Sequence, residues 1–409
     1  MNRRTAGAQT PVDREERGDG LPELTPADRR NLRFTHVALD NWRNFVTLDV
    51  ALQRRMFLVG PNAAGKSNLI DVFRFLADIV TVGGGFESAV AKRGGVSMMR
   101  SFAARRYPSV RVQVTLGTDA VPNEWVYELT FTQDNQRRPV ITREFVEHRG
   151  VTVRERPDAE DREDPERLRQ THMEQVNVNK AFRDVAEFFG TTRYMHIVPQ
   201  LVREPDRSVG KTNDPFGGDF LEQIARTPKQ TREARLRRIV AALAVAVPQL
   251  EELELHPDVR GVPHLRGKYR HWRQHGAWQS EEHFSDGTLR LFGLLWAVTD
   301  GTGPLLLEEP ELSLHPEVVR YIPQMFAQVQ RRTRRQILVS SHSVEILGDE
   351  GVALDEVVIL SPRSEGTAAA LALKDDRVTA MVSAGVNLSE ALAAVTRPTE
   401  ASQLSLFGK

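Results

Sequence analysis

The segment from Gly60 to Ser67 has the residue types and the spacing that bind the phosphates of a nucleotide. It fills every fixed position of the G-x-x-x-x-G-K-[ST] loop and reads Gly60-Pro61-Asn62-Ala63-Ala64-Gly65-Lys66-Ser67. The glycines let backbone N–H groups point toward a phosphate, and the N-terminus of a following helix adds about half a positive charge. We expect Lys66 to reach the β- and γ-phosphates and the Ser67 hydroxyl to bind Mg²⁺.

A second stretch offers two adjacent carboxylates after an apolar run, Pro304-Leu305-Leu306-Leu307-Glu308-Glu309-Pro310. In a phosphate-loop enzyme such a strand lies beside the strand of the loop. Glu308 would then hold Mg²⁺ through water, and Glu309 would orient or activate the attacking water. A buried strand that ends at a polar loop is common in any α/β protein, so the functional interpretation depends on the phosphate loop upstream.

Two shorter patterns follow the same logic and are less specific. Ser285-Asp286-Gly287-Thr288 precedes an apolar helix that begins at Leu289, which suits either a small anion site or an ordinary helix cap. The apolar run Ile337–Val339 ends in Ser340-Ser341-His342. His342 is either a group that contacts the nucleotide or a structural histidine.

The phosphate loop needs a strand before it and a helix after it, and the flanking residues predict both. Met56 to Val59 is a short apolar strand, and Asn68 to Ala77 places its apolar residues on one helical face. A chance match to the loop alone has a probability on the order of one per cent at average composition. The flanking pattern lowers it further and favours nucleotide binding.

The remaining elements predict an α/β protein in which two separated segments form one nucleotide core. Alternating residues predict an antiparallel sheet between residues 111 and 154, and helices are expected at Val176–Phe189 and Thr231–Val247. After residue 282 we expect helices at Thr288–Thr299 and Glu317–Arg331 and strands at Pro304–Leu307, Gln336–Ser340 and Glu356–Leu360. The expected division is a disordered leader (1–24), an N-terminal lobe with the phosphate loop and antiparallel sheet (25–154), a mainly helical insertion (155–260), a C-terminal lobe (261–395) and a flexible tail (396–409).

Composition narrows the class of protein. The chain has 409 residues, of which 40% are hydrophobic and 27% charged, as in soluble globular proteins. It has no cysteine, which excludes disulfides and thiolate metal sites and suits the cytoplasm, our expected location. No apolar run approaches the about 18 residues of a membrane span, so no membrane partner is expected. The formal net charge is zero, so any nucleic-acid surface must be a local patch.

The order of these motifs resembles the head of an ABC-type ATPase, in the SMC/RecF/OLD branch often described as AAA-type ATPases of prokaryotic defence and repair. The resemblance covers roughly residues 30–150 and 280–360. The Gly-Pro-Asn opening of the loop and the preceding Asn41-Trp42-Arg43-Asn44-Phe45 are similar to this branch rather than to transporter ATPases. The implied fold class is α/β, a P-loop NTPase with an ABC-ATPase head, an antiparallel β-subdomain and a helical insertion.

The resemblance also assigns roles and the cofactors ATP and Mg²⁺. It implies that Phe284–Thr288 is the signature loop, Glu309 the catalytic glutamate, Glu311–Leu314 the D-loop and His342 the switch histidine. Lys66, Glu309 and His342 are the expected catalytic residues, and Ser67 and Glu308 the expected metal ligands. The expected nucleotide contacts are Gly60, Pro61, Asn62, Ala63, Ala64, Gly65, Lys66, Ser67, Asn68, Arg43, Ser285, Asp286 and Gly287.

Two features depart from the family pattern. Glu308 stands where the family has Asp, so its carboxylate reaches one methylene further. No glutamine is clearly placed in the loop that links the lobes: Gln200 is a weak candidate, and Gln113 reads as a strand residue. Turnover is therefore expected to be slow or to depend on a partner.

In this family the signature loop faces the γ-phosphate of another subunit, which implies a homodimer, or a higher oligomer, closed by ATP. We expect a nucleotide-driven switch in anti-phage defence or DNA repair that works with a separate effector, a nuclease or a toxin. The alternatives are a nucleotide-gated scaffold that sequesters an effector with little turnover and, less favoured, a transporter ATPase subunit. Two basic runs could follow a nucleic-acid backbone, or could be solvated faces or protein interfaces; they are Arg226, Lys229, Arg232, Arg235, Arg237 and Arg238, and Arg266, Lys268, Arg270, His271, Trp272 and Arg273.

Overall fold

The computed structural model describes residue 25 and residues 31–101, 108–205, 214, 216–270, 277–343 and 345–397. The expected leader (1–24), residues 398–409 of the expected tail, and His271, Trp272 and Arg273 of the second basic run lie outside these residues. Three sheets organise the described chain: a mixed core sheet, a six-stranded antiparallel sheet and a small three-stranded sheet.

The core sheet has the strand order β15-β14-β3-β13-β12-β8. Its strands are β3 (Arg55–Val59), β8 (Arg193–Met195), β12 (Leu305–Glu308), β13 (Ile337–Ser341), β14 (Val357–Arg363) and β15 (Gly366–Leu371). All neighbours pair in parallel except β14 and β15. The carboxyl ends of β3, β13, β12 and β8 therefore meet at one edge, where ligands bind in open α/β sheets.

Side-chain alternation along β3 separates two hydrophobic cores. Met56 and Leu58 belong to the core shared with the antiparallel sheet, α2 (Lys66–Val80) and α6 (Arg183–Thr191). Phe57 and Val59 belong to a second core with α10 (Asp286–Thr299) and α12 (Ile322–Thr333). Both faces of β3 are buried, which explains its unbroken apolar run.

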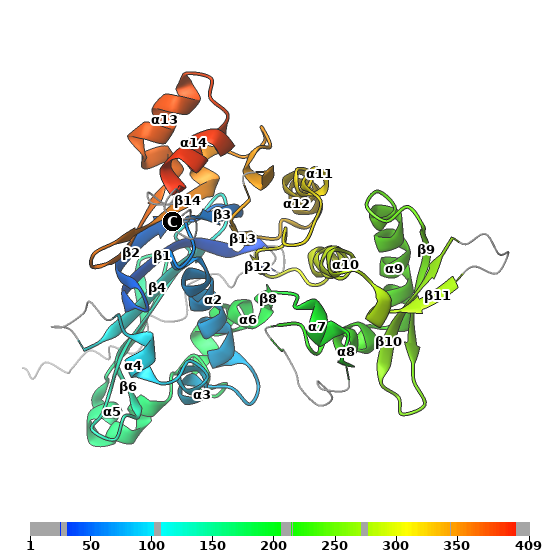
Figure 1. Ribbon diagram of the computed structural model, residues 1–409. Coiled ribbons are helices and arrows are strands. Elements are labelled where there is room, and N and C mark those ends of the chain that lie inside the picture. The colour runs from blue at the N-terminus through cyan, green and yellow to red at the C-terminus, as the bar shows by residue number, and fades with distance from the viewer. Residues whose placement is uncertain are drawn as a thin grey trace, which may run out of the picture.

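The antiparallel sheet has the order β2-β1-β4-β5-β6-β7. It lies beside α2 and shares a hydrophobic core with this helix (Figure 1). Its strands are β1 (Arg33–Trp42), β2 (Phe45–Ala51), β4 (Val110–Gly117), β5 (Trp125–Gln133), β6 (Pro139–His148) and β7 (Val151–Arg156). Between α2 and β4 lie the short helices α3 (Phe86–Ala91) and α4 (Val96–Met99).

The segment 155–260, which the sequence predicts to be a mainly helical insertion, has helices as its main elements and also strands. It contains α5 (Ala159–Glu163), α6, α7 (Pro199–Val202), α8 (Phe220–Arg226) and α9 (Lys229–Leu243). It also contains β8, which adds to the core sheet, and β9 (Leu250–Pro257), which pairs with β10 (Pro263–Tyr269). β10 in turn pairs with β11 (Ala277–Ser280), and α9 packs on this sheet at one end of the molecule, beyond α10 (Figure 1).

Three expectations need correction. The strand that ends in the two acids, β12, does not lie directly beside the phosphate-loop strand β3, because β13 lies between them and pairs with both. The helix expected over Glu317–Arg331 is broken into α11 (Pro316–Val319) and α12, which begins just before Pro323, because proline favours the first turn of a helix. The expected helix Val176–Phe189 is a 3₁₀ turn, Asn179–Phe182, followed by α6. The chain continues after β15 into α13 (Asp376–Ser383) and α14 (Leu388–Thr396). Within the described residues, no helix has the length and apolarity needed to cross a membrane.

Candidate nucleotide site

The phosphate loop connects β3 to α2, as the sequence predicts, and neither of its two glycines has room for a side chain. Gly65 has φ +94°, and a Cβ there would lie 2.1 Å from Asn44 Nδ2. A Cβ on Gly60 would lie 2.4 Å from the main-chain oxygen of Leu360. The loop is thus packed between the turn after β1 and the strand β14, and only glycine fits at these two positions.

The side chain of Lys66 turns back into the loop. Its ammonium donates hydrogen bonds to the carbonyls of Gly60, at 2.9 Å, and Pro61, at 3.1 Å, and lies 3.3 Å from His342 Nδ1. Burial lowers the pKa of Lys66, and three carboxylates oppose this effect by raising it: Glu309, Glu311 and Glu308. The cation therefore sits where phosphate oxygens bind in a loop of this type.

Ser67 and Glu308 lie together, although 241 positions separate them in sequence. The Ser67 hydroxyl donates a hydrogen bond to Glu308 Oε1, and the other carboxylate oxygen accepts one from the Tyr194 hydroxyl. Burial and the adjacent Glu308 raise the pKa of the Tyr194 phenol. One carboxylate and one hydroxyl form an all-oxygen donor set, which suits Mg²⁺ because that ion usually takes one or two protein ligands and completes its shell with phosphates and water. The residues present thus fit the predicted ion.

Glu309 faces His342 across the end of the core sheet. Glu309 Oε1 lies 2.9 Å from His342 Nε2, and the Glu309 backbone has φ +45°, a conformation uncommon for residues with a side chain. Its N–H donates to the carbonyl of Ser340, at 3.0 Å, and this bond ties the turn to β13. Glu311 strengthens the link, because its Oε1 accepts from the Ser341 hydroxyl and from the His342 N–H.

The signature segment caps α10 and packs on the D-loop. Ser285 is the N-cap, and its hydroxyl accepts from the Thr288 N–H at 3.1 Å, while Asp286 pairs with Arg203 at 2.6 Å. A Cβ on Gly287 would lie 2.6 Å from the carbonyl oxygen of Ser313, so the two segments are in close contact. Among the described residues, no hydrogen bond or ion pair joins residues 285–287 to residues 60–68.

The turn between β1 and β2 contacts the phosphate loop and α2 through the side chains of Arg43 and Asn44. The Arg43 guanidinium, predicted to contact nucleotide, pairs with Asp71 of α2 at 3.3 Å. Asn44 donates to the carbonyl of Ala64 at 3.1 Å, and its amide oxygen accepts from Asn68 at 2.7 Å. Asn68 is therefore in contact with this turn, and Asn44 is the residue of the turn that touches the loop.

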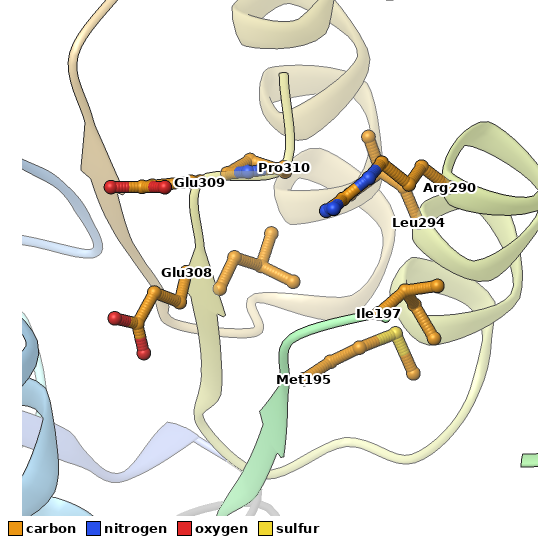
Figure 2. A pocket seen from close by; sticks show the side chains of 8 residues that line it. Met195, Ile197, Arg290, Leu294, Glu308, Glu309 and Pro310 are labelled. Carbon is orange, nitrogen blue, oxygen red and sulfur yellow. The ribbon is translucent and has the colours of Figure 1, made fainter. Parts of the chain in front are cut away.

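A small pocket lies behind the two acids and is separate from the phosphate loop. It is lined by Met195, Ile197, Arg290, Leu294, Leu307, Glu308, Glu309 and Pro310. Figure 2 shows that Arg290 extends from its helix toward this pocket, whereas the carboxylates of Glu308 and Glu309 point away from it. Burial lowers the pKa of Arg290, while Asp286, Glu309 and Glu311 raise it.

The family model described as "AAA domain, putative AbiEii toxin, Type IV TA system" matches residues 55–348, which include the phosphate loop, both acids and His342. The chain belongs to this family. The match spans well over half of the sequence and covers the parts that form the site.

The fold of this AAA family member is similar to that of SMC heads in solved structures. An SMC head bound to the C-winged helix domain of ScpA superposes with a TM-score of 0.51 at 12% identity, over 82% of this chain and 96% of that chain. An SMC head with an extended coiled coil bound to the C-terminal domain of ScpA, from Pyrococcus furiosus, gives a TM-score of 0.51 at 11% identity, over 86% and 100%. No curated protein matches the chain in sequence. The resemblance to ABC-type AAA ATPases of the SMC-like branch, and the fold class it implies, are confirmed.

Neither glutamine candidate lies in the site, but the structure places a histidine there that the sequence did not reveal. Gln200 is exposed on α7, and Gln113 lies on β4, where its side chain accepts from Arg111, so neither lies in the site. The strand next to β12 is β8, and His196 follows it, with Nδ1 3.2 Å from the main-chain oxygen of Glu308. β8 has only three residues, too few for periodicity to predict it.

Several cations of the two basic runs pair with acids. In the first, Arg226 pairs with Glu222, Lys229 lies near Glu233, and Arg235 pairs with Asp300 and covers Trp296. In the second, β10 lies beside the acidic β9, where Arg266, Lys268 and Arg270 pair with Glu254, Glu252 and Glu251. Arg237 and Arg238 are exposed and enter no ion pair in the described structure, so nucleic-acid binding stays a prediction centred on them.

A His342→Ala variant tests the contact of His342 with Glu309 and Lys66. We expect hydrolysis to fall roughly 10- to 100-fold, at the low end of general acid–base effects, while the Kd for ATP changes less than threefold. Phosphate release and fluorescent-nucleotide binding measure the two quantities. His36→Ala is the matched control, because His36 contacts Asp49 on the antiparallel sheet. If His342→Ala hydrolysed ATP at the wild-type rate, a role for His342 in hydrolysis would be ruled out.

Proposed function

We propose that this chain hydrolyses ATP with Mg²⁺ at a site shared by two copies, and that ATP binding and hydrolysis switch a separate effector protein. One observation carries the proposal: Lys66, Ser67, Glu308, Glu309 and His342 come from three separate parts of the sequence and converge at one edge of the core sheet. These are the groups that phosphoryl transfer to water requires.

Each group has a chemical task in the proposal. Lys66 neutralises charge on the β- and γ-phosphates, and the loop N–H groups hold their oxygens. Glu309 accepts a proton from the water whose oxygen attacks the γ-phosphorus, and the bond to the ADP oxygen breaks as the new bond forms. His342, beside both Glu309 and Lys66, orients the glutamate toward that water. Ser67 and Glu308 would hold Mg²⁺, which would supply charge neutralisation at the phosphates when bound.

Two features support a shared site. The signature residues Ser285, Asp286 and Gly287 make no polar contact with the phosphate loop of their own chain, and they cap a helix whose N-terminus favours anions. The signature segment also packs on the D-loop, which is bonded to β13 beside the switch histidine. A second copy whose signature meets the γ-phosphate would therefore be coupled to Glu309. Higher oligomers built from this dimer remain within the proposal.

The proposal of an effector protein rests on the comparisons with known proteins. The family description names a toxin–antitoxin system, and the SMC heads similar in fold are bound to domains of ScpA. We propose a toxin or nuclease partner in anti-phage defence or DNA repair. A scaffold that sequesters the partner with little turnover is the second candidate, favoured by the departure at Glu308 and by the lack of a glutamine beside β8.

The test is phosphate release by the purified chain with Mg²⁺ at increasing protein concentration. A shared site predicts that specific activity rises with concentration until dimers saturate. Activity independent of concentration would contradict the shared site. ATP-dependent dimers without measurable release would select the scaffold. Absence of both ATP binding and release would refute the proposal.

A matched pair of variants at Ser285 tests the contact between copies. Ser285→Asp keeps an N-cap of similar strength but places a carboxylate where the neighbour's γ-phosphate is proposed to bind, whereas Ser285→Asn keeps the cap without charge. We expect Ser285→Asp to weaken ATP-dependent dimerisation at least tenfold and Ser285→Asn to keep most of it. Light scattering with and without ATP measures both. Equal dimerisation of the two variants would place Ser285 away from the phosphate.

A further inference from the structure

Glu308 is contacted by one residue of β8, the strand at the edge of the core sheet, and by one residue that follows it. Its Oε2 accepts a hydrogen bond from the Tyr194 hydroxyl, and its main-chain oxygen lies 3.2 Å from His196 Nδ1. The remaining carboxylate oxygen, Oε1, accepts from Ser67. The Glu308 side chain is therefore held between α2 and β8, with a partner on each oxygen.

Tyr194 is itself fixed by contacts on both sides. The parallel register pairs Tyr194 with Leu306 and Met195 with Leu307, which brings the tyrosine alongside the end of β12. The Arg74 guanidinium of α2 lies over the Tyr194 ring, 4.0 Å from its centre, and is 3.8 Å from Asp71. Asp71 also pairs with Arg93 at 2.8 Å. The phenol hydroxyl thus has a fixed position relative to the helix that carries Ser67.

We propose that Tyr194 is a positioning residue that holds the carboxylate of Glu308 in the orientation needed to bind Mg²⁺, an inference that rests on the proposed ATP site. The family pattern has Asp at this position, and Glu has one more methylene and one more rotatable bond. The added length lets the carboxylate span from Ser67 to Tyr194, and the tyrosine bond removes the freedom that the added bond introduces. An aspartate at position 308 would be too short to keep both partners.

The direct test is Tyr194→Phe, which keeps the ring beneath Arg74 and removes only the hydroxyl. The Kd of a fluorescent ATP analogue is measured in Mg²⁺ and in EDTA, and the ratio of the two Kd values gives the gain in affinity due to the metal. We expect this gain to fall about tenfold, the low end of the effect of removing a group that orients a metal ligand. The Kd in EDTA should change less than twofold. Tyr321→Phe, at an exposed tyrosine, is the control.

Glu308→Asp provides an independent check. It remains usable if circular dichroism shows that Tyr194→Phe does not fold. The proposal predicts that Glu308→Asp loses the metal-dependent gain by a similar factor although it keeps the carboxylate. Adding Tyr194→Phe to it should then change the gain less than twofold, because the bond is already absent. A full gain in Tyr194→Phe or in Glu308→Asp would overturn the inference and leave the ATP site standing. A wild-type chain that binds the analogue in neither buffer would refute the ATP site itself.

Discussion

Lys66→Ala is expected to abolish ATP binding, with the Kd raised at least 100-fold, or about 2.7 kcal/mol. The ammonium lies inside the phosphate loop, where its partners are the carbonyls of Gly60 and Pro61 and the ring of His342. Without it, those carbonyl oxygens and the carboxylates of Glu308 and Glu309 would face the triphosphate uncompensated. The negative charges of these carboxylates and of the phosphates would repel one another strongly in a partly buried site.

The measurement is equilibrium binding of a fluorescent ATP analogue, with folding checked by circular dichroism. Lys92→Ala is the matched control: Lys92 follows the nearby helix α3 and its ion pair with Asp78 is exposed. We expect its Kd for ATP to equal that of the wild type within error. Lys66→Ala that binds ATP within tenfold of the wild type would remove the phosphate loop from the nucleotide site.

The sequence could predict the parts of the site that lie within local motifs. The phosphate loop is contiguous, and its glycines, Lys66 and Ser67 have fixed spacing, so its position between a strand and a helix followed directly. The acids after Leu307 and the histidine after β13 were recognisable because each ends an apolar run that forms a buried parallel strand. The alternation in residues 111–154 predicted the antiparallel strands because successive side chains of a strand point to opposite faces of the sheet.

Contacts between distant segments were beyond the reach of the sequence. Tyr194 and His196 meet Glu308 because a three-residue strand adds to the sheet edge, and no periodic signal marks so short a strand. The strand β10 was missed although its residues alternate, because proline and glycine are depleted in strands and β10 contains Pro263 and Gly267. The acids on β9 that pair with its cations come close only in three dimensions. The ion pair of Arg43 with Asp71 of α2 is another such contact, and the expected contact of Arg43 with nucleotide stays a prediction.

Glu309→Gln is expected to bind ATP as the wild type does, to hydrolyse it at least 100-fold more slowly, and to accumulate as a dimer when ATP is present. The amide is nearly isosteric with the carboxylate but cannot accept the proton of the attacking water. The exchange also removes one negative charge from the three that surround Lys66, which favours a bound triphosphate. Because the signature segment and the switch strand are both tied to the turn that begins at Glu309, the ATP-bound pair of chains should then persist.

Single-turnover hydrolysis and light scattering with ATP measure the two effects in the same preparation. Glu317→Gln, an exposed glutamate at the start of α11, is the control for loss of one negative charge and should behave as the wild type. A Glu309→Gln chain that still hydrolyses ATP at the wild-type rate would show that another group takes the proton. A chain that stops hydrolysis yet stays monomeric with ATP bound would instead separate the chemistry from the shared site, since the glutamate would then act within one subunit.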